Sequence, residues 1–223
     1  MQTRRVGRLD IAVPDLDPRE LDQVTEPPDG DLVGVLAGNS SWAGNRLYET
    51  RIGNSQASGV DATEAMWERV TLSGSVFDGV DLSHAEFSDV VIECCVLRDC
   101  RLTGAHFIGA VFTNVIFEGC RFDFATLRDV AGSGPVALVD CNLVNANFTS
   151  SRLPQLVLRD CKLDRLELQA CDLRGADLRG NGLTGIVGEL TSLRGVTLSR
   201  DQLPDLATMV VHDLNLTVAE DAR

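Results

Sequence analysis

Residues 102–127, LTGAHFIGAVFTNVIFEGCRFDFATL, decide the fold, because a large apolar side chain recurs there at every fifth position. The same step extends towards both ends of the chain and shifts once, by one residue, after Leu127. Only Ala57, Ala62 and Gly188 in the series lack a large apolar side chain. The central residues of the series are Trp42, Leu47, Ile52, Ala57, Ala62, Trp67, Leu72, Phe77, Leu82, Phe87, Ile92, Leu97, Leu102, Phe107, Phe112, Phe117, Phe122, Leu127, Leu138, Leu143, Phe148, Leu153, Leu158, Leu163, Leu168, Leu173, Leu178, Leu183, Gly188, Leu193, Leu198 and Leu203.

A second pattern accompanies the first, because the residue two positions before most centres is small. Ala85-Glu86-Phe87-Ser88-Asp89 and Ala176-Asp177-Leu178-Arg179-Gly180 are clear examples, with polar residues or Gly at the other positions. Neither the helical period of 3.6 nor the strand period of 2 produces this pattern. A five-residue unit with one large and one small inward side chain fits one side of a square coil.

This motif resembles the pentapeptide-repeat family, over roughly residues 40–203. The resemblance implies an all-β fold, a right-handed quadrilateral parallel β-helix in which four pentapeptides make one coil. Residues 32–199 then form about eight coils, a solenoid whose neighbouring coils hydrogen-bond to each other. The extra residue in the segment 130–135, which contains Gly132, Gly134 and Pro135, predicts a small bulge between coils.

The two ends predict caps on the open core. Residues 1–31 read as an N-terminal arm and cap, with Asp17-Pro18-Arg19-Glu20 as the start of a short helix. Residues 200–223 read as a capping helix, a short strand and a tail. The helix follows the capping-box pattern Ser199-Arg200-Asp201-Gln202. The alternation of Leu214, Leu216 and Val218 predicts the strand.

No constellation in the sequence points to catalysis, a cofactor or a metal. His84, His106 and His212 belong to no recognisable site, so we expect a protein that is not an enzyme. An active site on the flank of the β-helix is the remaining enzymatic alternative. Free Cys behaves as a small hydrophobe, which predicts core packing for the inward thiols. These are Cys95, Cys100, Cys120, Cys141, Cys161 and Cys171, and only Cys94 is expected to face outward.

Charge gives the candidate binding surface. The formal net charge is −13, and residues 60–99 hold nine acidic against two basic residues. An acidic surface repels nucleic acid and anionic membranes, so we expect neither as a direct ligand and expect a protein partner. The candidate partner-binding residues are Asp61, Asp78, Asp81, Glu86, Asp89, Glu93 and Asp99.

The rod shape, the acidic half and the C-terminal helix and strand are similar to the gyrase-targeting, quinolone-resistance members of the family. The resemblance implies a DNA mimic that binds or modulates DNA gyrase, with fluoroquinolone resistance as a further implication. The chain departs from those members in its N-terminal arm and in lacking a long loop, and the loops of some relatives are needed to rescue gyrase from drugs. The alternative is a structural or interaction scaffold for another protein partner.

The same resemblance implies a homodimer formed through the C-terminal end, and a monomeric cap is the alternative. The interface would comprise Leu206, Val210, Leu214, Leu216 and Val218. The N-terminus has no apolar segment typical of a signal peptide, and no stretch is long and apolar enough to span a bilayer. We therefore expect a cytoplasmic location.

Overall fold

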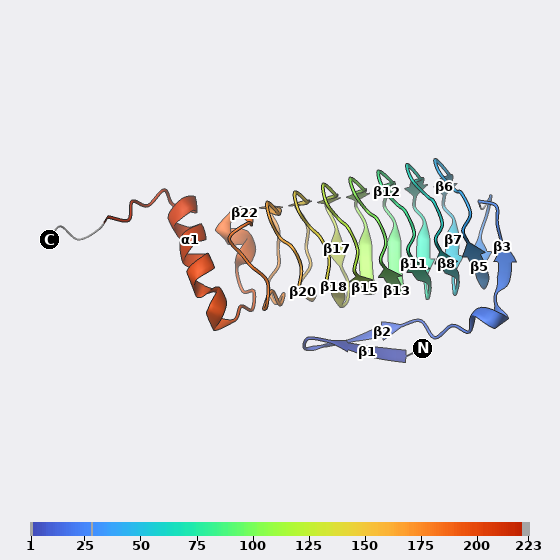
Figure 1. The fold of residues 1–223 in the computed structure, drawn as a ribbon, viewed down its shortest axis with the longest axis horizontal. Helices are drawn as coiled ribbons and strands as arrows, with labels where there is room; N and C mark the ends of the chain where they lie inside the picture. Colours follow the sequence, from blue (N-terminus) through green and yellow to red (C-terminus); the bar gives the residue numbers. More distant parts are fainter. Residues whose placement is uncertain (1, 28, 220–223) are drawn as a thin grey trace.

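Four consecutive pentapeptides form one turn of a parallel β-solenoid that has about eight turns (Figure 1). The computed structural model describes residues 2–27 and 29–219. The consecutive centres Phe107, Phe112, Phe117 and Phe122 each lie on a different side of one coil. We name the four faces of the shaft after these residues. The predicted β-helix with a C-terminal capping helix is confirmed.

Three of the faces are built from two parallel sheets. An eight-stranded sheet forms the Phe107 face, and a twelve-stranded sheet forms the Phe112 and Phe117 faces, which β13 and β15 join. The eight strands are β6 (Arg46–Tyr48), β9 (Met66–Glu68), β12 (Glu86–Ser88), β14 (His106–Ile108), β16 (Thr126–Arg128), β19 (Asn147–Thr149), β21 (Glu167–Gln169) and β22 (Val187–Gly188). The twelve strands are β3 (Asp22–Val24), β4 (Leu32–Val33), β5 (Val35–Gly38), β7 (Arg51–Gly53), β8 (Gln56–Ser58), β10 (Thr71–Ser73), β11 (Val76–Asp78), β13 (Val91–Arg98), β15 (Val111–Glu118), β17 (Ala131–Gly132), β18 (Val136–Val139) and β20 (Leu156–Arg159).

The Phe122 face is held by single bridges between successive coils, which connect residues twenty or twenty-one apart. The register confirms the predicted stacking, because Leu102 N donates to Arg121 O and Phe122 N donates to Asn142 O at 2.7 Å each. The extra residue lies where β15 meets β18, with Phe117 opposite Leu138. Bends at Ser133 and Gly134 absorb it without a long loop.

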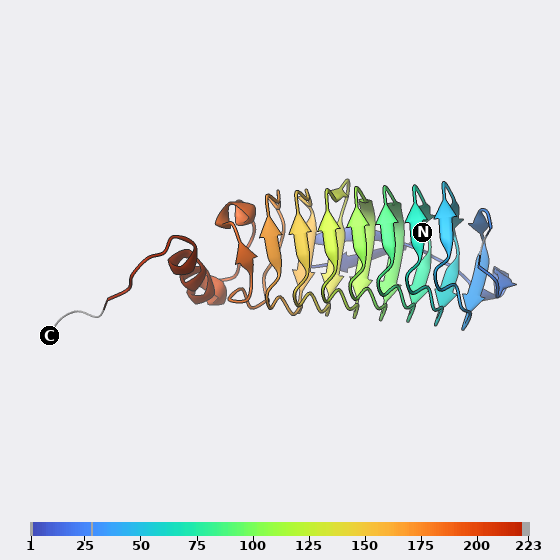
Figure 2. The same ribbon diagram turned by 90° about the horizontal axis from the view of Figure 1, so that it is seen from above.

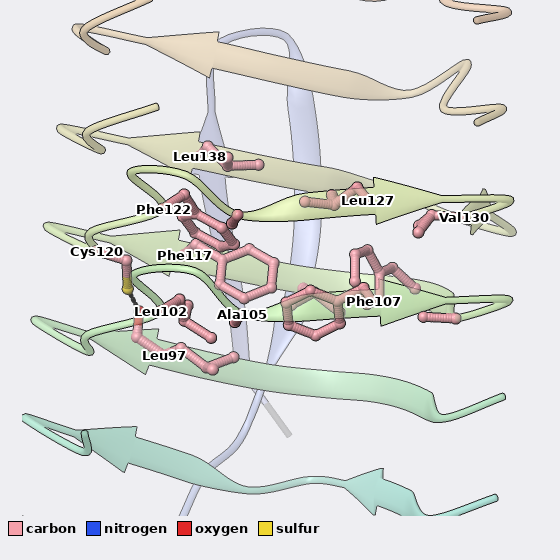
Figure 3. Close-up of a cluster of buried hydrophobic side chains, with 14 of the residues drawn as sticks. Leu97, Leu102, Ala105, Phe107, Phe117, Cys120, Phe122, Leu127, Val130 and Leu138 are labelled. Carbon is pink, nitrogen blue, oxygen red and sulfur yellow. Dashed lines mark hydrogen bonds between the residues drawn. The ribbon is translucent and has the colours of Figure 1, made fainter. Parts of the chain in front are cut away.

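The core contains the large side chains predicted from the period of five. From Trp42 to Leu193 every central residue except Gly188 is buried. Phe107 stacks on Phe87 with ring centroids 4.5 Å apart, and edge contacts continue through Phe112 and Phe117 to Phe122. Figure 3 shows Phe107, Phe117 and Phe122 in this core. The last member of the series departs from the prediction. Leu203 is 55% exposed because the chain leaves the coil there and begins the helix.

Most corners of the coils have a left-handed backbone two residues after the centre. Gly109 has φ 66° there, as expected for a residue without a Cβ atom. Phe124 has φ 60° at the corresponding corner and is 61% exposed. An aromatic residue in this conformation is an outlier, and it has no core contact to compensate for the strain.

The C-terminal cap is α1 (Leu203–Asp213), preceded by short 3-10 helices at Leu190–Leu193 and Arg200–Gln202. The predicted capping box is present, and Ser199 N donates to Gln202 Oε1 at 2.8 Å. Met209 is the side chain of α1 that is buried against the last coil. None of the helices in residues 2–27 and 29–219 is long and apolar enough to cross a membrane.

The strand expected at residues 214–218 differs in the structure. Asn215 turns the chain with φ 51°, and Leu216 N donates to Val211 O, so the segment closes the helix and then extends from it (Figure 1). The described part of the chain offers no strand beside this segment with which it could pair. Residues 220–223 of the predicted tail lie outside the described residues.

The N-terminal arm is mainly a β-hairpin, which the sequence analysis did not predict. The strands β1 (Gln2–Val6) and β2 (Leu9–Val13) are antiparallel, and Gly7 with φ 58° forms the first position of their tight turn. The predicted helix start is a single 3-10 turn at Pro18–Glu20, where the Asp17 side chain accepts from Arg19 N. Met1 and Pro28 of the arm lie outside the described residues.

The hairpin folds back along the Phe117 face, beside β13, β15 and β18 (Figures 1 and 2). Its apolar side packs on an outward stripe made of Val96, Ile116, Ala137 and Val157, and Ile11 at the centre is fully buried. Polar contacts fix its position. Arg4 pairs with Glu118 through two hydrogen bonds, Arg8 donates to Gly175 O, and Ala12 N donates to Asn114 Oδ1 at 3.4 Å.

Acid is expected to loosen this hairpin below about pH 4. The pKa of Glu118 is lowered because its carboxylate accepts hydrogen bonds from the Arg4 guanidinium. Because the folded pKa lies below the ordinary value of about 4.3, the contribution of the pair is complete above that value and is lost as the pH falls through the folded pKa. Hydrogen exchange of the β1 amides between about pH 3 and pH 6 measures the effect. Glu118→Gln should remove this pH dependence, and an equal acid response in that variant would contradict the assignment.

Candidate partner-binding surface

The seven predicted acidic residues lie at least partly exposed on the N-terminal coils, but on four different faces. Asp61 and Asp81 are bridge partners on the Phe122 face, while Glu86 and Asp89 are on or next to β12 of the Phe107 face. The other three flank or belong to the strands of the remaining faces: Glu93 on the Phe112 face, and Asp78 and Asp99 on the Phe117 face. The structure therefore brings them together as a ring around the shaft, which we name the acidic collar (residues 60–99).

Some of these carboxylates also hold the coil corners. Asp81 Oδ1 accepts from Ser83 N at 3.0 Å and from Ser83 Oγ at 2.6 Å. Asp61 Oδ1 makes the same pair of contacts with Thr63, at 3.1 and 2.8 Å. An Asp side chain that accepts from the backbone two residues on stabilises a turn. These two residues therefore combine a structural role with a surface charge.

The charge density of the collar is comparable with that of duplex DNA. Nine acidic and two basic residues give the collar a net charge of −7. Two coils rise about 10 Å at about 4.8 Å each, so the collar carries about one charge per 1.4 Å. Duplex DNA carries one per about 1.7 Å. Residues 100–139 contain three acidic and three basic residues, so the charge ends abruptly at the next coil.

The cysteines are all free and buried. Cys100, Cys120, Cys141 and Cys161 occupy one inward column, and Cys120 Sγ donates to Leu97 O at 3.4 Å (Figure 3). Burial raises the pKa of the Cys95 thiol to about 12. A thiol that stays protonated is a poor nucleophile and a poor metal ligand. Cys95 therefore contributes packing. The four thiols of the column are at most 8% exposed and belong to the same hydrophobic core.

Cys94, which is expected to face outward, is not exposed to solvent. Cys94 is only 6% exposed and hydrogen-bonds to Asn114, which also accepts from the hairpin at Ala12 N. Desolvation raises the pKa of its thiol. The hairpin thus covers a position that would face solvent in the bare repeat.

The remaining candidate features are the three histidines and one groove. His84, His106 and His212 are exposed and far apart in the sequence, on different coils or on α1. Among residues 2–27 and 29–219 no three His, Cys, Asp or Glu side chains are grouped as metal ligands. A groove of about 730 Å³ lies between α1 and the last coils, lined in part by Glu167, Val187, Met209 and His212. Val187 belongs to β22, the last strand of the eight-stranded sheet.

The five residues expected at a dimer interface lie together at the C-terminal end. Leu206 and Val210 are half-buried on α1, whereas Leu214, Leu216 and Val218 are 59%, 50% and 78% exposed. Their role in a dimer stays a prediction.

The hairpin surface was not predicted from the sequence, although a signal was present. One residue before the centre the repeat is usually polar, yet Val96, Ile116, Ala137 and Val157 occupy this position on one face. Four apolar residues in one outward column indicate that something covers them.

Comparison with known proteins identifies the repeat. A family model described as pentapeptide repeats matches eight copies over residues 58–93, 95–130 and 141–180, which is just over half of the chain. No curated protein matches the sequence.

Several solved structures are similar in part. A trypsin-treated variant of QnrB1, a plasmid-mediated fluoroquinolone resistance protein, is 18% identical, with 89% of this chain and 96% of that chain covered and a TM-score of 0.43. HetL of Nostoc sp. strain PCC 7120, involved in regulating heterocyst differentiation, is 18% identical, with coverage of 80% and 91% and a TM-score of 0.31. A pentapeptide repeat protein of the Arabidopsis thaliana thylakoid lumen is 20% identical, with coverage of 56% and 70% and a TM-score of 0.23.

Proposed function

Since the chain belongs to the pentapeptide-repeat family, we propose that it is a non-enzymatic binding protein whose acidic collar occupies a basic, DNA-binding surface of a protein partner. The observation that carries the proposal is the charge density of the collar, about one charge per 1.4 Å against about 1.7 Å for duplex DNA. Basic surfaces that bind DNA recognise its phosphates largely by charge. A rod of similar charge density therefore competes for such a surface.

The distribution of acids around the shaft supports this proposal. Duplex phosphates surround the helix axis, so a protein that binds DNA from more than one side contacts charge on each side. Asp61, Glu86, Glu93 and Asp99 present charge on all four faces of the shaft. The collar corresponds to about three base pairs in length, at about 3.4 Å each. We therefore expect a short contact with a strong dependence on salt.

The sequence resemblance to gyrase-targeting family members suggests DNA gyrase as the partner. The segment between β17 and β18 is a short bulge, so we propose gyrase binding and do not extend the proposal to protection from fluoroquinolones. The hydrophobic residues Leu206, Val210, Leu214, Leu216 and Val218 are proposed to join two copies end to end, which would leave both collars free.

Reversing charge in the collar is expected to weaken gyrase inhibition by about tenfold or more. The variant replaces Asp61, Asp81 and Glu86 by Lys, which removes acceptors for the basic groups of gyrase. Supercoiling assays with purified protein at micromolar concentration, repeated at two salt concentrations, measure the effect.

The matched control replaces Asp164, Glu167 and Asp213 by Lys, three exposed acids outside the collar that give the same change in charge. It should inhibit as the wild type does. Failure of the wild-type protein to bind or inhibit gyrase would reject gyrase as the partner. Equal loss in both variants would show that total charge acts, and not the collar.

A scaffold for a different protein partner is the second candidate. It is favoured by the change of sign along the Phe122 face, where Asp81 is followed by Arg101 at 3.5 Å. Duplex DNA has no such change of sign. Pull-down experiments that recover one protein other than a topoisomerase, and lose it in the collar variant, would support this function.

A further inference from the structure

One outward row on the Phe122 face carries charges of both signs in a regular order. Successive coils place Ser41, Asp61, Asp81, Arg101, Arg121 and Asn142 directly above one another as bridge partners. We name these six residues the mixed-charge row. Two acids are followed by two bases, with Ser41 before them and Asn142 after them, and Lys162 continues the column beyond Asn142.

Within one molecule the charges of the row have local partners: Asp61 and Asp81 accept from Thr63 and Ser83, and Arg121 pairs with Asp123 at 3.4 Å. Along the row itself they are poorly matched. Asp61 stacks on Asp81, and Arg101 stacks on Arg121, so like charges are neighbours at the spacing of adjacent strands, which is destabilising. The contact across the change of sign, between Arg101 and Asp81, is 3.5 Å long. The Arg101 and Arg121 side chains are 64% and 58% exposed. They are therefore available to acceptors outside the chain.

The order of the charges is antisymmetric about the point between Asp81 and Arg101. When two copies lie side by side in opposite directions, a two-fold axis at this point brings each acid opposite a base. Asp81 then faces Arg101 of the second copy, and Asp61 faces its Arg121, so four ion pairs form in total. A surface that complements itself under a two-fold rotation is the requirement for an isologous dimer.

We propose that the Phe122 face is a self-association surface, on which a second copy of this chain binds antiparallel through the mixed-charge row. The neutral ends fit the same arrangement, because Ser41 faces Asn142 of the second copy. Beside the row, the exposed Ala43 faces the half-buried Val144 of the second copy. No like charges of the row meet in this register, whereas parallel packing would place Asp61 on Asp61 and Arg121 on Arg121.

Phe124 gives the face an apolar anchor. It is 61% exposed and holds φ 60° at the corner beside Arg121, where a small residue would cause less strain. In the antiparallel pair it lies against the corner formed by Thr63 and Glu64 of the second copy. A strained, exposed aromatic residue gains from a contact that buries it.

The contact is short and therefore weak. The six coils of the row span about 25 Å at about 4.8 Å per coil, along one narrow face. We therefore expect the contact to bury less surface area than the roughly 1,200–2,000 Å² of a stable interface. Exposed ion pairs are screened by salt. The dimer should form at high protein concentration and low salt. It covers Asp61 and Asp81, so it would compete with a basic partner for this side of the collar.

The test uses sedimentation velocity on the full chain without any partner, so its result does not depend on gyrase binding. Two variants reverse one half of the row each: Asp61→Arg with Asp81→Arg, and Arg101→Asp with Arg121→Asp. Each makes the row uniform in sign, and self-association should weaken by about tenfold or more at low salt. Mixing the two variants should restore association, because a positive row then meets a negative one.

Controls separate this surface from others. Glu68→Arg with Glu86→Arg makes the same charge change on the Phe107 face and should associate as the wild type does. Leu214→Asp with Leu216→Asp removes the C-terminal apolar residues and should leave the lateral contact intact. Circular dichroism checks folding, because Asp61 and Asp81 also stabilise turns that their substitution removes. The variant that replaces Arg101 and Arg121 by Asp leaves those turn contacts in place.

Three outcomes would overturn the proposal. The first is a wild-type chain that remains monomeric at low salt up to about 1 mM. The second is a mixture of the two reversed variants that fails to associate although both are folded. The third is association that the Leu214 and Leu216 substitutions abolish and the row variants leave unchanged.

Discussion

Replacing Phe107 by Ala is expected to lower the free energy of unfolding by about 3–5 kcal/mol. Phe107 is 1% exposed and lies at the centre of the aromatic series. It stacks on Phe87 with ring centroids 4.5 Å apart and meets the edge of Phe112 at 5.7 Å, so the change removes contacts both between coils and within one coil. Urea unfolding followed by circular dichroism measures the loss.

The Phe107→Ala substitution should also reduce the cooperativity with which the two halves of the shaft unfold. Each coil contacts only its neighbours, so the cooperativity of a solenoid depends on every interface between coils. A cavity at Phe107 weakens interfaces near the middle, and the unfolding transition should broaden or separate into two steps. A central coil is therefore more sensitive than a terminal one.

Phe124→Ala is the matched control, because it makes the same substitution at an exposed corner, two residues after Phe122. Because 61% of Phe124 is exposed, its replacement should change the free energy of unfolding by less than about 0.5 kcal/mol. Equal effects of the two substitutions would show that the aromatic series does not stabilise the shaft in the way described.

Replacing Ile11 by Asp is expected to release the N-terminal hairpin from the shaft. Ile11 belongs to β2 and is fully buried against the stripe that includes Val96 and Ile116. An unpaired carboxylate at this position costs several kcal/mol, more than a two-stranded hairpin can retain on its own. Hydrogen exchange of residues 2–13 and trypsin cleavage at Arg4, Arg5 and Arg8 should both accelerate by at least about tenfold.

The shaft itself should remain folded in this variant, since the period of five does not include the hairpin. The uncovered apolar stripe should bind a hydrophobic dye. Thr3→Asp introduces the same charge on the exposed side of β1 and should leave protection unchanged. A hairpin that stays protected in the Ile11 variant would mean that Arg4, Arg8 and Asn114 hold it without the apolar contact.

Particular residues show how far the sequence alone predicts this protein. Each pentapeptide fixes the direction of its own side chains, so Phe107, Cys120 and Leu163 could be assigned to the core from local pattern alone. The stacking of Asp61 on Asp81 followed from the twenty-residue coil. Within the described residues the strand expected near Leu216 did not form, because alternation predicts a strand only where a partner strand is present.

What the sequence by itself determined is the coil, its core and the position of its bulge, because these depend on residues close together in the chain. Tertiary structure decided which outward positions remain free. Arg4 meets Glu118 across 114 residues, and the hairpin thereby buries Cys94 and the apolar stripe. The collar and the change of sign at Arg101 follow from the twenty-residue register of the coils, whereas the path of the N-terminal arm does not. The physical reason is that this surface joins residues of the coils to the arm, whose position depends on the whole fold and not on the repeat.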